Sequence, residues 1–189
     1  MTRRAASLAA ALLLGLAACG EPRSAAGADR AAAVDRAAAW LWSRQHDDGA
    51  FRSARYAVLR SGQAMTPFAL HALLAAGAAP SDERVQRGLA WLRRAVDVGR
   101  VVEGEAALGY ADPDLLEYPV YATSLAILVL ARCGDGADRP RTAAMAGWLA
   151  RQQCGEHKGF EPTAAAYGAF GFGAVGLAPG DPGHVDLTH

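Results

Sequence analysis

Residues 66–77 read TPFALHALLAAG, and residues 123–134 read TSLAILVLARCG, so the two segments align without a gap. Both are apolar almost all round, and a helix without a polar face is normally buried. Each segment closes on a glycine, Gly77 or Gly134, where a left-handed C-terminal cap is expected. We therefore predict two buried helices; the pattern leaves open whether they begin at the threonines or one turn earlier.

A second family of segments alternates with the first and carries a tryptophan, at Trp40, Trp91 and Trp148. The spacing is 25 residues both from Thr66 to Trp91 and from Thr123 to Trp148. The return path varies, with 26 residues from Trp40 to Thr66 and 32 from Trp91 to Thr123. The constant spacing indicates a fixed helical hairpin, and the variable one indicates a loop that tolerates insertion.

The tryptophan-bearing segments are amphipathic. Apolar residues recur in them at helical spacing, namely Val34, Ala38 and Leu41, and then Val85, Leu89, Leu92 and Val96. Ser81 and Asp138 are predicted caps where the second and third of these helices begin. Buried helices that alternate with half-exposed ones predict an all-α fold. We expect a partial α/α toroid with alternating inner and outer antiparallel helices, an open arc of about two and a half hairpins.

These segments resemble the QW repeat of squalene-hopene cyclases and their prenyltransferase relatives. The matching residues are Arg36-Ala37, Trp40-Leu41, Gln45 and Gly49-Ala50-Phe51 in the first copy, Arg87-Gly88 and Trp91-Leu92 in the second, and Trp148-Leu149, Gln153 and Gly159-Phe160 in the third. Val96 replaces the Gln of the second copy, Ala144 stands where the third should have its basic residue, and Phe51 and Phe160 replace the closing Trp. The resemblance implies that the Gln caps a helix end and that the closing aromatic stacks on the neighbouring repeat. Structural roles are thus expected for Trp40, Gln45, Phe51, Trp91, Trp148, Gln153 and Phe160.

The N-terminus predicts export. Residues 1–18 begin with two arginines, continue as a short apolar run and end in small residues before Cys19, which is the pattern of a signal peptide. The Leu-Ala-Ala-Cys ending resembles the lipobox of bacterial lipoproteins, which implies cleavage before Cys19 and its acylation. We expect a membrane anchor at Cys19, a flexible tether over residues 19–29 and a repeat domain over residues 30–189, facing the periplasm or cell exterior. Gly20 lacks an acidic retention signal, and by the same resemblance this slightly favours the outer membrane.

Charge argues against a nucleic-acid partner. Removing residues 1–18 takes away Arg3 and Arg4 and leaves 17 basic against 19 acidic residues. No basic stripe remains to follow a phosphate backbone.

The sequence contains no complete catalytic or metal motif, and we predict no cofactor. Asp112-Pro113-Asp114-Leu115 lacks the final aspartate of the Asp-x-Asp-Asp motif found in the cyclases. The Asp-x-Cys pair of protein prenyltransferases is also missing. His184, Asp186 and His189 are metal-ligand types, but their place at the end of the sequence makes coincidence the favoured reading.

Cys154-Gly155-Glu156-His157 resembles the Cys-Gly-Glu-Gln of thioester domains, but His157 has no carboxamide with which a thioester could form. A disulfide to Cys133 is also not expected. The two cysteines fall at opposite ends of one hairpin, roughly 18 Å apart at ~1.5 Å per residue, whereas bridged Cα atoms lie within ~7 Å. We predict two free thiols.

Aromatic residues on the inner helices and loops are the candidates to line a cavity: Tyr56, Phe68, His71, Tyr118 and Tyr121. Such a cavity would suit an isoprenoid or another apolar ligand. The same residues would equally fill a core, and that interpretation is favoured.

Three functions remain open. The leading one is a non-catalytic, membrane-anchored scaffold that binds a protein partner or an apolar small molecule. The second is a terpene cyclase or isomerase whose acidic motif lies beyond residue 189, and the third is a degenerate thioester-type protein. Whether the chain is an enzyme is left open. Closing a toroid at this spacing would need well over 300 residues, so we expect an N-terminal fragment of a longer protein.

Overall fold

The structure is a computed structural model that describes residues 25–56, 59–98, 118–171, 178–179 and 185–186. Its helices are α2 (Ala25–Trp42), α3 (Met65–Ala75), α4 (Glu83–Val98), α5 (Pro119–Cys133) and α6 (Arg139–Gln152), with 3-10 turns η2 (Gly136–Asp138) and η3 (Glu156–Lys158). Strands β1 (Phe170–Gly171) and β2 (Val185–Asp186) form a short antiparallel pair with Phe170 opposite Asp186. The described part is mainly helical, so the all-α class is confirmed.

The chain divides into two compact units between Ala37 and Ala38. Of the first unit, the structure describes only the N-terminal part of α2. This helix begins at Ala25, inside the segment for which a tether was expected, and its alanine-rich sequence has high helix propensity. The second unit contains α3 to α6 and the core.

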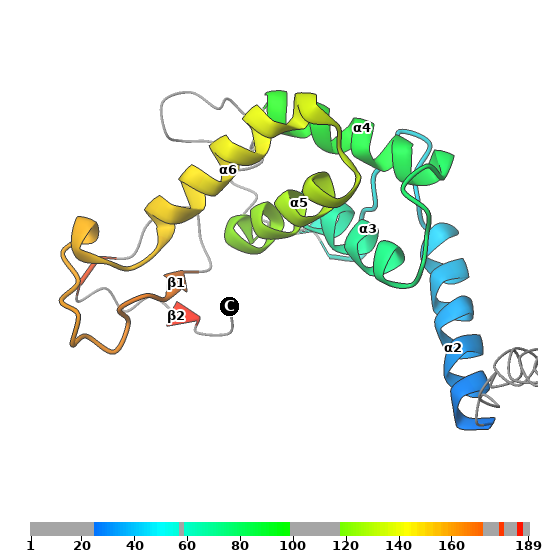
Figure 1. Cartoon of the computed structure of the whole chain (residues 1–189), viewed down its shortest axis with the longest axis horizontal. Helices are drawn as coiled ribbons and strands as arrows, with labels where there is room; N and C mark the ends of the chain where they lie inside the picture. The colour runs from blue at the N-terminus through cyan, green and yellow to red at the C-terminus, as the bar shows by residue number, and fades with distance from the viewer. Residues whose placement is uncertain (1–24, 57–58, 99–117, 172–177, 180–184, 187–189) are drawn as a thin grey trace, which may run out of the picture. The chain divides into compact units, whose positions relative to one another are not determined.

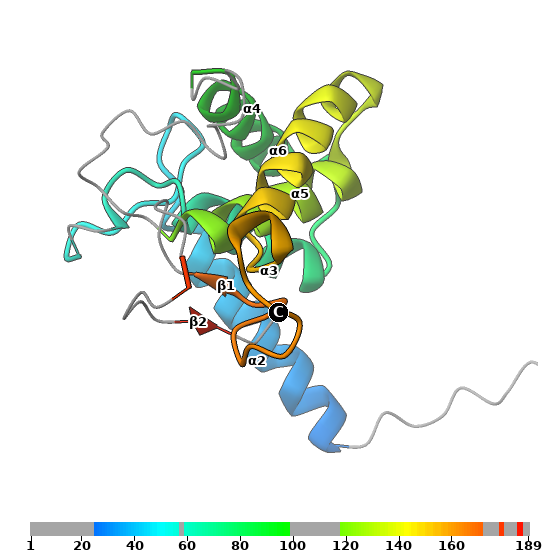
Figure 2. The ribbon, with the colours of Figure 1, turned by 90° about the vertical axis from the view of Figure 1, so that its left-hand side faces the viewer.

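Helices α3 to α6 form two layers (Figures 1 and 2). Helix α3 packs on α4 and α5, and α5 packs on α6 and α4. The C-terminal ends of α3 and α5 lie together, because Arg132 in the last turn of α5 donates to the carbonyl of Leu74 in the last turn of α3 at 3.1 Å. This guanidinium also places a positive charge where the α3 dipole is negative.

The core lies between these layers. On α4 the predicted stripe is completely buried, with Val85, Leu89, Leu92 and Val96 all at 0% exposure. Each such side chain contributes about 1.5–3 kcal/mol on burial. They meet Leu70, Leu73 and Leu74 of α3 and Ala126, Val129 and Leu130 of α5. The periodicity of α4 therefore predicted its buried face correctly.

The threonines that open the two apolar segments are both inside the protein. Thr66 and Thr123 are each 0% exposed. The Thr66 hydroxyl accepts from the backbone N–H of Phe51 at 3.0 Å, whereas the Thr123 hydroxyl has no hydrogen-bond partner among the described residues. Helix α3 begins one residue before Thr66 and α5 four residues before Thr123, so the two apolar helices start differently.

Two glycines let backbone segments approach closely. A Cβ on Gly88 of α4 would lie 2.8 Å from both methyl carbons of Leu70. A Cβ on Gly49 would lie 2.3 Å from the carbonyl oxygen of Arg87, and Gly49 also has a φ of +93°. The loop after α2 therefore rests on the α4 backbone itself. The contact of Gly88 with Leu70 gives a physical reason for the small residue in the Arg87-Gly88 pair.

The predicted C-terminal caps differ from each other. Gly77 has a φ of +101°, and the N–H of Ala78 donates to Leu73 while that of Gly77 donates to Leu74. This is the expected left-handed Schellman arrangement. Gly134 is instead extended, with φ −75° and ψ 169°, so the prediction was wrong there. A Cβ at Gly134 would lie 2.4 Å from an Asp138 oxygen, and glycine is required for space instead.

The predicted N-terminal caps are also corrected. Asp82, not Ser81, accepts the backbone N–H of Arg84 in the first turn of α4, at 2.8 Å. Asp138 does precede α6, but its side chain makes no capping bond to that helix. The Asp138 carboxylate instead accepts hydrogen bonds from Arg93 and Arg141. Asp135 caps η2 by accepting from the backbone N–H of Ala137.

Candidate functional site

An apolar groove runs between α3 and α5. Its volume is about 630 Å³. The lining residues are Leu59, Ala64, Met65, Phe68, Tyr118, Tyr121, Ala122, Ser124, Leu125 and Leu128. None of these ten residues carries a charge. Small-molecule sites typically measure about 300–1,000 Å³ and are mostly apolar with a few polar groups, so this groove has the size and character of one.

The α3 side of the groove comes from the start of that helix. Phe68 is 60% exposed although it belongs to an apolar helix. Its neighbours Ala69 and Leu70 face the core instead, at 1% and 0% exposure. Successive helical positions differ by 100°, so these two residues can face the core while Phe68 faces the groove.

The α5 side comes from the N-cap Tyr118 and from the first ten residues of the helix. Leu128 is 52% exposed and Tyr118 is 44% exposed, while Tyr121 and Leu125 are half-buried. The Ser124 hydroxyl donates to the carbonyl of Val120 at 2.8 Å, so it satisfies its own helix. Both walls thus belong to the N-terminal parts of their helices. Together with the meeting of the C-terminal ends at Arg132, this makes α3 and α5 parallel neighbours.

Three of the five residues predicted to line a cavity, Phe68, Tyr118 and Tyr121, line this groove. Tyr56 and His71 do not; Tyr56 is 57% exposed, with the Arg55 guanidinium 5.7 Å from its ring centroid. None of the five is buried, so they do not fill the core as the favoured interpretation had it.

The aliphatic lining residues Leu59, Leu125 and Leu128 were not predicted. For Leu125 and Leu128 the signal in the sequence was an apolar helix with more apolar positions than a single neighbouring helix can cover. Leu59 lies before α3 and had no such signal.

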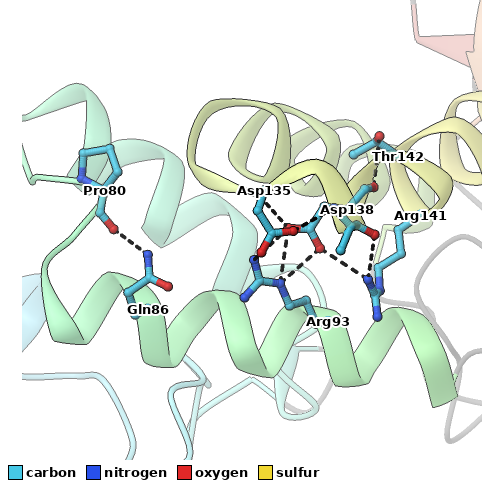
Figure 3. A network of polar contacts seen from close by, with 8 residues as sticks. Pro80, Gln86, Arg93, Asp135, Asp138, Arg141 and Thr142 are labelled. Carbon is cyan, nitrogen blue, oxygen red and sulfur yellow. Dashed lines mark hydrogen bonds and ion pairs between the residues drawn. The ribbon is translucent and has the colours of Figure 1, made fainter.

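A partly buried ion-pair network joins α4 to the start of α6 (Figure 3). The Asp138 carboxylate, 3% exposed, accepts from Arg93 Nε at 3.0 Å and from Arg93 Nη2 at 2.7 Å. It also accepts from Arg141 at 3.4 Å and from the backbone N–H of Asp135 at 3.2 Å. The hydrogen bonds from Arg93 hold the pKa of the Asp138 carboxyl below its usual range.

A hollow of about 370 Å³ adjoins Asp138 and Thr142. Both carboxylate oxygens of Asp138 are already engaged by donors. The Thr142 hydroxyl donates within its own helix region, at 3.0 Å to the carbonyl of Arg139. The carboxylate of Asp138 therefore holds α4, η2 and α6 together. Sequence reasoning missed this network, because Arg93 and Asp138 are 45 residues apart.

The first QW-like copy uses a different tryptophan from the one expected. Trp40 is 58% exposed and carries the Arg44 guanidinium over its ring at 5.1 Å. Trp42 packs on the core instead, with its ring centroid 6.4 Å from that of Phe51. Residues two apart on a helix point about 200° apart, so only one of the two can face inward.

Gln45 connects this copy to the next tryptophan-bearing helix. Its side-chain N–H donates to the carbonyl of Gly49 at 3.1 Å and to that of Arg84, in the first turn of α4, at 2.8 Å. Phe51 is 2% exposed and lies in the main core. This bond ties the first copy to α4 but does not cap that helix, because the unpaired groups at a helix N-terminus are N–H groups and not carbonyls.

In the third copy, Trp148 is 3% exposed and packs with Val120, and Phe160 is 7% exposed. Gln153 donates to the carbonyl of Gly168 at 2.9 Å and so ties the end of α6 to the segment that follows. Trp91 of the second copy is half-buried, with Arg52 over its ring at 5.9 Å. The three tryptophans therefore occupy three different environments.

Both cysteines in the described part are free thiols, Cys133 half-buried and Cys154 fully buried. Burial raises the pKa of the Cys133 thiol. The backbone of Cys154 pairs with Ala169 and Gly168, at 2.8 Å and 2.7 Å. These bonds hold the backbone of the buried Cys154 against the segment that follows η3.

Several predicted features lie outside the described residues. These are the signal peptide, Cys19, the segment Asp112 to Leu115, His184 and His189. Within the described part, His, Cys, Asp and Glu side chains form no group of three suited to a metal ion. Among its helices, none combines the length and apolar character needed to cross a bilayer.

Comparison of the chain with protein-family models, with curated proteins and with solved structures finds no match.

Proposed function

We propose that this chain is a non-catalytic, membrane-anchored repeat protein that binds a neutral apolar small molecule in the groove between α3 and α5. The observation that carries the proposal is the groove itself. Its walls are aromatic and aliphatic, its volume is about 630 Å³, and its ten lining residues bear no charge. An ionised ligand would lose its hydration there without gaining a partner, which favours a neutral one.

The finer architecture belongs to the same proposal: a partial α/α toroid with α3 and α5 as inner helices and α4 and α6 as outer ones. It is supported by the parallel packing of α3 beside α5 and by the equal spacing from threonine to tryptophan. The bond from Gln45 to Arg84 supports kinship with the QW-repeat proteins. In such an arc the groove would lie on the concave side.

The membrane anchor rests on the sequence of residues 1–19 alone. Mass spectrometry of the chain made in a bacterium would test it, with acyl chains expected on Cys19. An unmodified Cys19 in a processed, exported chain would refute the anchor and leave the groove unaffected.

Binding can be tested with 1,6-diphenylhexatriene, an uncharged apolar fluorophore, and residues 19–189 carrying Cys19→Ser so that no lipid competes. We expect saturable binding that Phe68→Ser weakens about tenfold, because a buried phenylalanine side chain contributes about 1.5–3 kcal/mol and 1.4 kcal/mol is a factor of ten. Tyr56→Ser is the matched control, since Tyr56 is 57% exposed against 60% for Phe68 but lies outside the groove. Non-saturable binding, or equal losses in both variants, would reject the proposal.

A further inference from the structure

Tyr118, at the rim of the groove, has an unfavourable backbone conformation. Its φ is 47° and its ψ is 62°, and it is the one non-glycine residue with positive φ in the described part of the chain. The left-handed region is disfavoured for bulky side chains because Cβ approaches the following carbonyl. Pro119 follows directly, and a residue before proline normally adopts an extended conformation. Two local preferences are therefore broken at one position.

The same residue is also a poor choice as a helix cap. Tyr118 is the N-cap of α5, and its carbonyl accepts the N–H of Ala122 at 2.9 Å. Any residue supplies that carbonyl, and the tyrosine side chain adds no capping hydrogen bond. Serine, aspartate, asparagine or glycine would suit the position better. The requirements of the helix thus do not explain why a tyrosine occupies this position. Residues with a strained backbone concentrate at ligand-binding sites, which points to a role in binding.

The ring of Tyr118 is placed to meet a ligand. It lines the groove and is 44% exposed. Polar side-chain atoms in the lining come from Tyr118, Tyr121 and Ser124, and the Ser124 hydroxyl is already bonded to Val120. The Tyr118 hydroxyl makes no hydrogen bond within the part of the chain that the structure describes. It therefore offers a donor at the edge of a mostly apolar surface.

We propose that Tyr118 contacts the ligand and selects, among neutral apolar molecules, those with one hydrogen-bonding end, such as a long-chain alcohol. This inference rests on the proposed function, because it assigns a specificity to the same groove. The apolar walls of α3 and α5 take the chain, and the Tyr118 hydroxyl bonds the oxygen at its end. The strained backbone is retained because it holds the phenol ring over the groove.

The test compares 1-decanol with 1-chlorodecane as displacers of diphenylhexatriene from residues 19–189 carrying Cys19→Ser. The two molecules share a chain and differ in the terminal acceptor. We expect the wild-type sequence to prefer the alcohol about fivefold, the size of one net hydrogen bond, and Tyr118→Phe to lose that preference while still binding the fluorophore. Tyr118→Gly is expected to raise the midpoint of thermal unfolding and to weaken binding of both displacers.

The outcomes separate the two proposals. If Tyr118→Phe keeps the preference for the alcohol, or if Tyr118→Gly binds both displacers as the wild type does, the role of Tyr118 is wrong. The groove proposal then still stands, provided Phe68→Ser weakens binding. A Tyr118→Gly variant that is no more stable than the wild type would overturn the argument from strain. Failure of every variant, the wild type included, to bind the fluorophore saturably would reject the proposed function itself.

Discussion

Replacing Asp138 with Asn removes the charge that holds Arg93 of α4 against the start of α6. Asp138 is 3% exposed and receives three contacts from Arg93, at 2.7, 3.0 and 3.2 Å. Breaking a fully buried pair costs about 3–5 kcal/mol. Arg93 is 28% exposed and has Asp135 at 3.7 Å, so water and a second carboxylate partly replace the lost partner. We therefore expect a loss of about 2 kcal/mol, near the lower end for a hydrogen bond to a charged group.

The assay is thermal and urea unfolding followed by circular dichroism at pH 7. For a protein of this size, about 2 kcal/mol lowers the unfolding midpoint by roughly 4–8 °C. Asp48→Asn is the matched control, because the Asp48–Arg52 pair is also bidentate, at 2.9 and 2.6 Å, but Asp48 is 43% exposed. Exposed pairs contribute under about 1 kcal/mol, so the control should lose far less.

The effect also depends on pH. Because Arg93 lowers the folded-state pKa of Asp138, the stability from this pair is present above the unfolded pKa, about 3.9. It is lost as pH falls through the lower folded pKa. The difference between the wild type and Asp138→Asn should therefore shrink below about pH 4. Equal losses in Asp138→Asn and the control at pH 7, or a difference that persists undiminished at low pH, would refute this reasoning.

Two further comparisons test packing and hydrogen bonding by chemical denaturation. Gly49→Ala should lose about 3 kcal/mol, since its Cβ would lie 2.3 Å from a backbone oxygen; Gly77→Ala, with a similar φ and nothing within 4 Å of its Cβ, should lose only about 1 kcal/mol. Equal losses would show that the close contact is unimportant. Thr66→Val should lose about 2 kcal/mol by leaving the Phe51 N–H unpaired. Thr123→Val should be neutral or stabilising, because that hydroxyl has no partner among the described residues; a loss matching that of Thr66→Val would contradict this.

Those parts of the fold that follow from strong local periodicity could be predicted from the sequence. The four apolar residues of α4 are all fully buried, because a 3.6-residue pattern leaves one face for the core. The recurrence of Thr66 as Thr123 likewise predicted two helices with buried threonines. The expectation that both helices are buried all round was wrong, because Phe68 and Leu128 are 60% and 52% exposed. Local chemistry was a poorer guide at the helix ends. Gly77 and Gly134 look alike in the sequence, yet only Gly77 has positive φ.

The candidate site depended on contacts that a sequence does not display. Phe68 and Tyr118 were singled out as aromatic, but their exposure depends on which neighbours cover an apolar helix. Leu128 was passed over because leucines on such a helix normally face a core. The sequence motif assigned the structural role to Trp40, whereas Trp42 is the residue that packs on the core. The spacing of the motif predicts where the helix lies in the sequence but not which of its faces turns toward the core.

Successive tryptophan-bearing helices are linked in two different ways, and this difference sets an order of disassembly. Between the first and second, Gly49 packs against the backbone of Arg87, and this contact involves no titratable or charged group. At the second link, buried Met145 stands where α4 has Gly88, and the ion pair of Asp138 makes the connection. Acid therefore removes the Asp138 ion pair at the second link and leaves the contact of Gly49 with Arg87 in place. We expect α6 to detach first as pH falls, while α3 and α4 stay folded together.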